Sequence, residues 1–175
     1  MFKETVIKSD RAVAMIYTIF TSVLIFFFFA AMVDIGHGLL VRRQLQSMAD
    51  AASLGGAMEH DIVLESDNGE LKQVAVIFEE EAKDTAEELI ERNADNFNFY
   101  YNNDSENGEE DNSKEFGRVE IVDKEITLKA EDELEVSLRA SVDAVLLGLV
   151  TEGEVTDFYV QAAAESTVTP PEENS

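Results

Sequence analysis

The chain has 175 residues, of which 37 are acidic and 13 basic, so its net charge is −24, and it contains no cysteine. The absence of cysteine excludes disulfides, thiolate metal sites and cysteine nucleophiles, and so acidic a chain repels nucleic acid and anionic lipid surfaces. The charge is uneven, because residues 1–43 carry five basic and three acidic side chains whereas residues 44–175 carry eight basic and 34 acidic ones.

An apolar run comes first along the chain. Residues 12–33 are 22 residues without a charge, and a helix of that length spans about 33 Å, the thickness of a bilayer's hydrocarbon core. We predict a transmembrane helix there, preceded by a cytoplasmic leader at residues 1–11. A cleaved signal peptide is the alternative, but its apolar region is only about 7–15 residues long and ends near a small-x-small cleavage site. The nearest such triplet here, residues 49–51, lies far beyond the run.

The orientation of this helix is not set by lysine and arginine, because three precede the run and two follow it. We place the N-terminus in the cytoplasm and the C-terminal domain outside, because a short leader before a long acidic domain suits a signal anchor. The prediction is a single-pass protein of the cell membrane, with the lipid bilayer as one partner.

The helix is predicted to continue as a stalk over residues 34–57. Small and apolar residues recur there at spacings of 3, 4, 3 and 4, as in a helix packed along one seam. They are Gly38, Val41, Leu45, Met48 and Ala52. Gly55 and Gly56 are typical of positions just beyond a helix end, so we expect the helix to stop at Leu54.

Residues 58–169 are predicted to form an exported acidic head. A second, amphipathic helix is indicated over residues 71–93, with apolar residues on one face and acidic ones on the other. The apolar face consists of Leu71, Val74, Ala75, Phe78, Ala82, Ala86, Leu89 and Ile90.

A polar, aperiodic stretch at residues 102–115 is typical of an exposed loop. Its acids raise a calcium hypothesis, but setting Gly108 as the central glycine of an EF-hand puts Lys114 where a glutamate ligand is required. An irregular calcium site stays open as the alternative to a solvated loop. We predict no cofactor.

Beyond this loop the period changes from 3.6 to 2, which indicates a strand or a short hairpin over residues 118–130 and strands over residues 134–145 and 158–168. In the middle segment, Leu134, Val136, Leu138, Ala140 and Val142 alternate with polar residues. The predicted fold class is therefore α+β, with a long N-terminal helix, a second amphipathic helix and a C-terminal antiparallel sheet of three to four strands, in a pilin-like order. Residues 170–175 are predicted to be a disordered tail.

The first third of the chain resembles the TadE/TadG-like proteins of tight-adherence (Flp) pilus assembly. Their pattern is an apolar helix followed by V-D-x-G, an R-x-Q-L-Q-like run and A-D-A-A-A-L-A-G-A. It is carried here by Val33, Asp34, Gly36, Arg43, Gln44, Leu45, Gln46, Ala49, Asp50, Ala51, Ala52, Leu54, Gly56 and Ala57. Residues 145–168 also resemble the end of such proteins, where a short apolar turn precedes an alanine-rich strand.

The resemblance implies a membrane-anchored structural or assembly component of a Tad/Flp-type pilus or a related secretion machine, similar to a minor pilin or pseudopilin. The implied partners are other single-span pilus or pseudopilus subunits or the inner-membrane assembly platform, and a homo-oligomer stays open. Substrates of prepilin peptidase carry a glycine before the apolar helix and a glutamate within it. This chain has no glycine before Gly36 and no acid between Asp10 and Asp34, so we expect it to stay unprocessed in the membrane.

The candidate site is a set of residues for helix packing or partner contact along the stalk. It consists of Asp34, Gly36, Gly38, Arg43, Gln44, Leu45, Gln46, Ala49, Asp50 and Ala52. One interpretation of Asp34 is plain solvation where the helix leaves the hydrocarbon, with His37 in reach at i+3. The other is that Asp34 fixes the register of a partner helix whose backbone approaches at Gly36 and Gly38. The alanines suit close packing either against a partner or against the chain's own second helix.

No catalytic site is indicated, and we expect that the protein is not an enzyme. His37 and His60 are the only histidines, neither has the spacing of a zinc site, and no serine lies in a nucleophile elbow. The alternative function is a single-pass, membrane-tethered extracellular binding or adhesion module unrelated to pili. Its local candidate is the aromatic run at residues 97–101, which equally suits packing of the second helix onto the sheet. A sensor is disfavoured by the short cytoplasmic leader.

Overall fold

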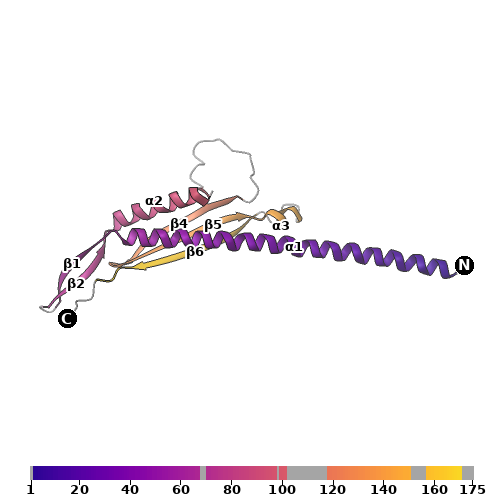
Figure 1. Cartoon of the computed structure of the whole chain (residues 1–175), viewed down its shortest axis with the longest axis horizontal. Helices are drawn as coiled ribbons and strands as arrows, with labels where there is room; N and C mark the ends of the chain where they lie inside the picture. The colour runs from indigo at the N-terminus through magenta and orange to yellow at the C-terminus, as the bar shows by residue number, and fades with distance from the viewer. Residues whose placement is uncertain (1, 68–69, 98, 102–117, 151–156, 171–175) are drawn as a thin grey trace, which may run out of the picture. The chain divides into compact units, whose positions relative to one another are not determined.

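The structure is a computed structural model that describes residues 2–67, 70–97, 99–101, 118–150 and 157–170. The chain divides into two compact units. Unit 1 comprises Met1–His37 and Ala144–Thr156, and unit 2 comprises Gly38–Asp143 and Asp157–Ser175. Helix α1 (Phe2–Ala57) contributes residues to both units (Figure 1).

The end of α1 differs from its prediction. The helix was expected to stop at Leu54, but it continues through both glycines to Ala57. The glycines serve close packing instead of termination, because a Cβ on Gly56 would lie 2.5 Å from Leu134 Cδ2 and 2.7 Å from the Ala82 carbonyl oxygen. Glycine is used wherever another backbone must approach this closely.

The main sheet of unit 2 has the strand order β3-β4-β5-β6. Strands β4 (Val119–Ala130), β5 (Glu133–Asp143) and β6 (Asp157–Thr167) are antiparallel, and the two-residue β3 (Tyr100–Tyr101) pairs with β4 in parallel. The predicted C-terminal antiparallel sheet and the α+β class are therefore confirmed. Every predicted inward residue of β5 is buried, as alternation on a sheet with one covered face requires.

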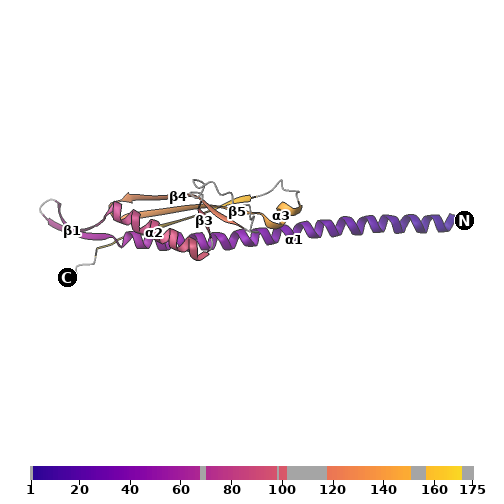
Figure 2. The same ribbon diagram turned by 90° about the horizontal axis from the view of Figure 1, so that it is seen from above.

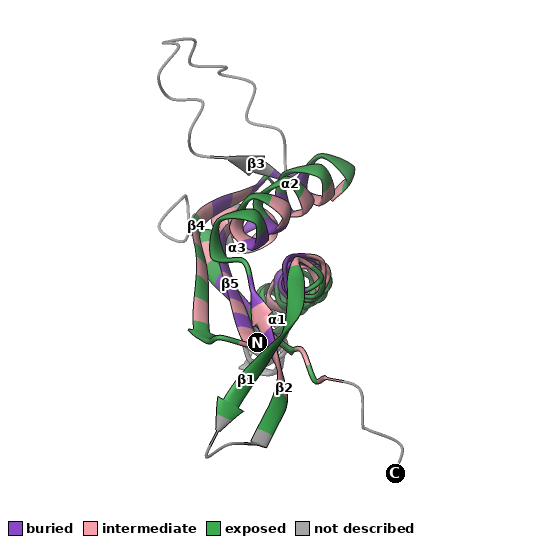
Figure 3. Cartoon of the chain, turned by 90° about the vertical axis from the view of Figure 1, so that its left-hand side faces the viewer, coloured by how far each residue is buried: buried purple, intermediate pink, exposed green. Residues whose placement is uncertain are grey.

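Helices α1 and α2 (Glu79–Phe97) both cover the inner face of this sheet (Figure 3). The core between them joins residues of α1, α2 and the strands. It consists of Val41, Leu45, Met48, Ala49, Ala52, Ala86, Ile90, Ala94, Phe99, Val119, Ile121, Val136, Leu138, Ala140, Val142, Val160 and Ala162. The predicted apolar seam of the stalk is thus the part of α1 that packs into the chain's own core.

A β-hairpin precedes α2 and was not predicted. Strands β1 (His60–Asp67) and β2 (Glu70–Ile77) form a two-stranded antiparallel sheet of their own, in which Val63 pairs with Val74. The prediction of a helix from Leu71 is therefore wrong over its first third. The apolar residues there fit a helical period, but the run is rich in β-branched residues, which favour strands.

Helix α2 begins later than predicted, at Glu79, with three acids in its first turn. Acidic side chains at this position stabilise a helix by interacting with its dipole. Ala82, Ala86, Ile90 and Ala94 are buried, so the predicted apolar face is confirmed from residue 82 onward. Phe78, just before the helix, is 46% exposed.

Unit 1 contains the apolar part of α1 and the short helix α3 (Val145–Val150). α3 lies beside α1 in both Figure 1 and Figure 2. Its first helical hydrogen bond joins the Gly148 N–H to the Ala144 carbonyl at 3.2 Å. The apolar turn implied by the family resemblance is thus a turn and a half of helix.

Candidate functional site

Asp34 is buried by the chain itself. Its side chain is only 2% exposed, and its Oδ1 and Oδ2 accept the N–H of Leu146 at 3.1 and 3.2 Å. Leu146 lies in the first turn of α3, where backbone N–H groups have no partner within the helix. The carboxylate therefore acts as an N-cap supplied from α1, and it is not simply solvated at the helix exit.

His37 lies one turn after Asp34. Its Nε2 is buried and has no hydrogen-bond partner among the described residues.

The two glycines of the stalk have different surroundings. A Cβ on Gly38 would lie 2.5 Å from Cε2 of the Phe158 ring, whereas no described atom lies within 4 Å of a Cβ built on Gly36. Gly38 therefore lets β6 approach α1 within the same chain. Gly36 is half-buried, and the described residues leave room for a Cβ at this position.

Polar residues of α1 bind the edge strand β6. Gln46 Nε2 donates to the Ala163 carbonyl and to Asp50 Oδ1, both at 2.9 Å, and Ser53 Oγ lies 3.0 Å from Ser166 Oγ. From residue 38 to residue 53 the helix advances about 22 Å, and from residue 158 to residue 166 the strand advances about 26 Å. α1 therefore runs alongside β6 in the same direction, and Gln46 satisfies one backbone carbonyl of this edge strand.

The remaining predicted residues divide between core and surface. Leu45, Ala49 and Ala52 are fully buried in the core with α2, and Gln44 is half-buried. Arg43 and Asp50 are exposed. Leu39 and Leu40, which lie outside the predicted seam, are 57% and 60% exposed.

This geometry can be compared with known proteins. Residues 12–59 match the family model described as "Putative Flp pilus-assembly TadE/G-like". The resemblance predicted from the sequence is thereby confirmed over that segment, which we call the TadE/G-like segment. No curated protein and no solved structure matches the chain.

The TadE/G-like segment includes the apolar run of α1. Within the part of the chain that the structure describes, one helix is both long enough and apolar enough to cross a membrane, and that helix is α1. The mean hydropathy of its most apolar stretch is 2.3. Two of its hydroxyls bond within the helix: Thr18 Oγ1 donates to the Ala14 carbonyl at 2.9 Å, and Ser22 Oγ donates to the Thr18 carbonyl at 2.8 Å. Such internal bonds suit a hydrocarbon environment. The family match and this helix together support a membrane-associated pilus-assembly component.

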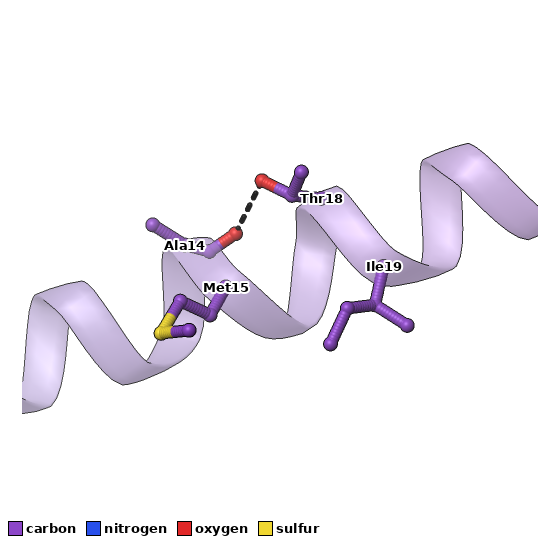
Figure 4. A pocket seen from close by; sticks show the side chains of 4 residues that line it. All are labelled: Ala14, Met15, Thr18 and Ile19. Atoms are coloured by element: carbon purple, nitrogen blue, oxygen red, sulfur yellow. Dashed lines mark hydrogen bonds between the residues drawn. The ribbon is translucent and has the colours of Figure 1, made fainter.

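A shallow hollow lies on the same helix. Figure 4 shows its lining residues Ala14, Met15, Thr18 and Ile19, all from α1. One helix face cannot enclose a small ligand, and the two polar atoms drawn in Figure 4, the Thr18 hydroxyl and the Ala14 carbonyl oxygen, are bonded to each other. The hollow is thus a feature of the helix surface without chemistry of its own.

The rest of the predicted chemistry concerns the head. The loop at residues 102–115, with its calcium hypothesis, and the tail at residues 171–175 lie outside the described residues. Phe99 is buried in the core and its ring lies 5.9 Å from that of Phe97, so this part of the aromatic run packs the end of α2 onto the sheet.

On the outer sheet face, Lys129 Nζ lies 3.1 Å from Glu165 and 3.3 Å from Glu135. Hydrogen bonds to Glu165 and Glu135 raise the pKa of Lys129 above 10.5.

Proposed function

We propose that the protein is a structural or assembly component of a Tad/Flp-type pilus or a related secretion machine, similar to a minor pilin or pseudopilin. One observation carries this proposal. The TadE/G-like segment, residues 12–59, coincides with the helix that contains both the apolar run and the seam of the head core. In the proposed topology, residues 12–33 span the membrane once, the N-terminus is cytoplasmic and unit 2 is extracytoplasmic.

The shared helix explains why anchor and head belong together. Val41, Leu45 and Met48 are core residues of unit 2 and belong to α1. Unit 2 therefore loses part of its core if α1 is removed. Each large side chain lost lowers the free energy of unfolding by about 2–5 kcal/mol. A head built in this way remains attached to its membrane helix during assembly.

The partner surface is proposed to be the exposed side of α1. The buried seam is already occupied by α2 and the sheet, so a partner helix must contact other residues. Leu39, Leu40 and Arg43 are exposed, and Gly36 admits close approach. Small and apolar residues at such a position suit packing against another single-span subunit or the inner-membrane assembly platform.

The acidic head limits the choice of partner. Residues 44–175 carry 34 acidic and eight basic side chains, so heads of identical copies repel each other at low salt. A homo-oligomer would therefore form through α1, and contacts of the head favour neutral or basic surfaces. Nucleic acid is not proposed as a partner. We also propose that the head is not catalytic and holds no cofactor.

The alternative function is a membrane-tethered extracellular binding or adhesion module, and one feature favours it. The β1–β2 hairpin exposes apolar side chains, with Leu64 at 64% and Leu71 at 72% exposure. A two-stranded sheet is marginally stable alone in water, and exposed apolar strands are typical of binding surfaces. In this alternative the hairpin binds an external protein, and α1 serves only as the tether.

The test is deletion of the gene followed by electron microscopy of surface filaments and complementation. The proposal predicts that filaments are lost and that the full chain restores them. A hairpin variant with Leu64→Ser and Leu71→Ser should restore filaments as well, whereas Leu39→Glu with Leu40→Glu should not. Normal filaments in the deletion strain would overturn the proposal. If filaments are normal but adhesion is lost in the deletion strain, and only the hairpin variant fails to restore adhesion, the alternative is favoured.

A further inference from the structure

Asp34 and Ala30 lie four residues apart on one face of α1 and are 2% and 3% exposed. The Leu146 N–H is bonded to the Asp34 carboxylate. α3 is thereby held beside the end of the apolar run, residues 12–33.

The sequence of α3 is unusual for a surface helix. Residues 144–150, Ala-Val-Leu-Leu-Gly-Leu-Val, contain no polar side chain, and the flanking residues Asp143 and Thr151 are polar. Val145 and Leu146 are half-buried, and neither belongs to the core cluster of unit 2. A helix that is apolar all round is normally buried in protein or in lipid.

The α1 surface at the same level is also apolar. Phe29, Met32 and Val33 are 66%, 73% and 50% exposed, and Ile35 is 62% exposed. Phe29, Met32 and Val33 belong to the apolar run, and Ile35 follows it just beyond Asp34. An apolar segment held beside the end of a membrane helix therefore lies at the depth of the bilayer interface.

We propose that α3 is a second membrane-contacting element, which enters the boundary between lipid headgroups and acyl chains beside α1. This inference rests on the membrane anchorage of α1 proposed above. It also explains the buried carboxylate. A charge at this depth is costly when it lacks partners, and α3 supplies a backbone N–H to Asp34 where water is scarce.

The contact is apolar rather than electrostatic. The chain is strongly acidic and repels anionic lipid, and α3 has no basic residue that could bind a headgroup phosphate. Insertion of α3 should therefore depend little on salt or on the fraction of anionic lipid.

The test is depth measurement on the full chain in phosphatidylcholine vesicles. The natural chain has no cysteine, so a single cysteine labels one position with a fluorophore that brominated lipids quench. Val145→Cys and Gly148→Cys probe α3, Phe28→Cys is the reference for the span, and Leu54→Cys is the reference for water. Phe28 and Leu54 have the same 62% exposure in the protein, which makes them a matched pair.

We expect the α3 probes to reach about half or more of the quenching at Phe28, because interfacial helices insert to about 5–10 Å, and the Leu54 probe to show none. If Phe28 is quenched and both α3 probes instead respond to a water-soluble quencher as Leu54 does, this inference is wrong and the anchorage stands. If Phe28 is itself water-exposed, the anchorage fails. If the α3 probes are shielded from both quenchers, protein covers α3, and the lipid contact is overturned.

Discussion

Substitution of the two stalk glycines by alanine separates packing within the chain from contact with a partner. Alanine is favoured over glycine inside a helix by about 1 kcal/mol, so both variants gain that amount before packing is considered. At Gly36 no described atom lies within 4 Å of the added Cβ, and the gain should remain. At Gly38 the Cβ would lie 2.5 Å from the Phe158 ring, and overpacking costs about 1–3 kcal/mol.

The two variants should therefore differ by about 1–3 kcal/mol in the free energy of unfolding, with Gly38→Ala the less stable. The assay is thermal unfolding of the full chain in a non-ionic detergent, followed by near-ultraviolet circular dichroism. For a head of this size, the difference corresponds to roughly 3–15 °C in Tm. Phe158→Leu in the Gly38→Ala background should recover part of the loss, because it removes the clashing ring.

Equal Tm values for Gly36→Ala and Gly38→Ala would refute this account of the stalk. Gly36 is proposed to face a partner, so a large side chain there should change filaments and leave stability unchanged. Gly36→Leu is the variant for that test. Loss of filaments without a drop in Tm is the expected result, and loss of both would place Gly36 in the fold instead.

Three further predictions concern packing and charge in the head. Leu45→Ala should lower the free energy of unfolding by about 2–5 kcal/mol because Leu45 is fully buried. Leu40→Ala is the control and should change the free energy of unfolding by less than about 0.5 kcal/mol. Urea unfolding measures both variants. Gln46→Ala should cost about 0.5–1.5 kcal/mol and speed amide hydrogen exchange in β6, and unchanged exchange would contradict the role of Gln46 at that edge. The raised pKa of Lys129 means that its ion pairs stabilise the protein below pH 10.5 and that this contribution is lost as the pH rises through the folded-state pKa. Tm should therefore fall more steeply above pH 10.5 in the natural chain than in Lys129→Met, and parallel curves would contradict this.

The elements with strong periodicity could be predicted from the sequence. The seam through Val41, Leu45 and Met48 and the alternation through β5 each repeat over several turns or pleats, so burial on one face was readable without the structure. The hairpin was missed because the spacing of Leu71, Val74 and Ala75 also fits a helix. The Asn-Gly pair at residues 68–69, a common hairpin turn sequence, was the available signal.

The surroundings of Asp34 could not be predicted. Its partner Leu146 is 112 residues away in the chain and donates a backbone N–H, so no side-chain pattern marks the contact. Gly55 and Gly56 show a related ambiguity, because glycine either ends a helix or admits a close neighbour, and the sequence is the same in both cases. Local patterns therefore identified which side of α1 is buried but not what buries it.

The central claim is that α1 uses its buried seam for its own head and its exposed side for another pilus subunit. The most direct test is cysteine crosslinking in cells with Leu40→Cys and Leu45→Cys, since the natural chain supplies no competing thiol. Leu40 is 60% exposed and Leu45 is fully buried. The account predicts that Leu40→Cys crosslinks to another single-span pilus protein and that Leu45→Cys does not. Crosslinking at Leu45, or at neither position in cells that make filaments, would contradict it.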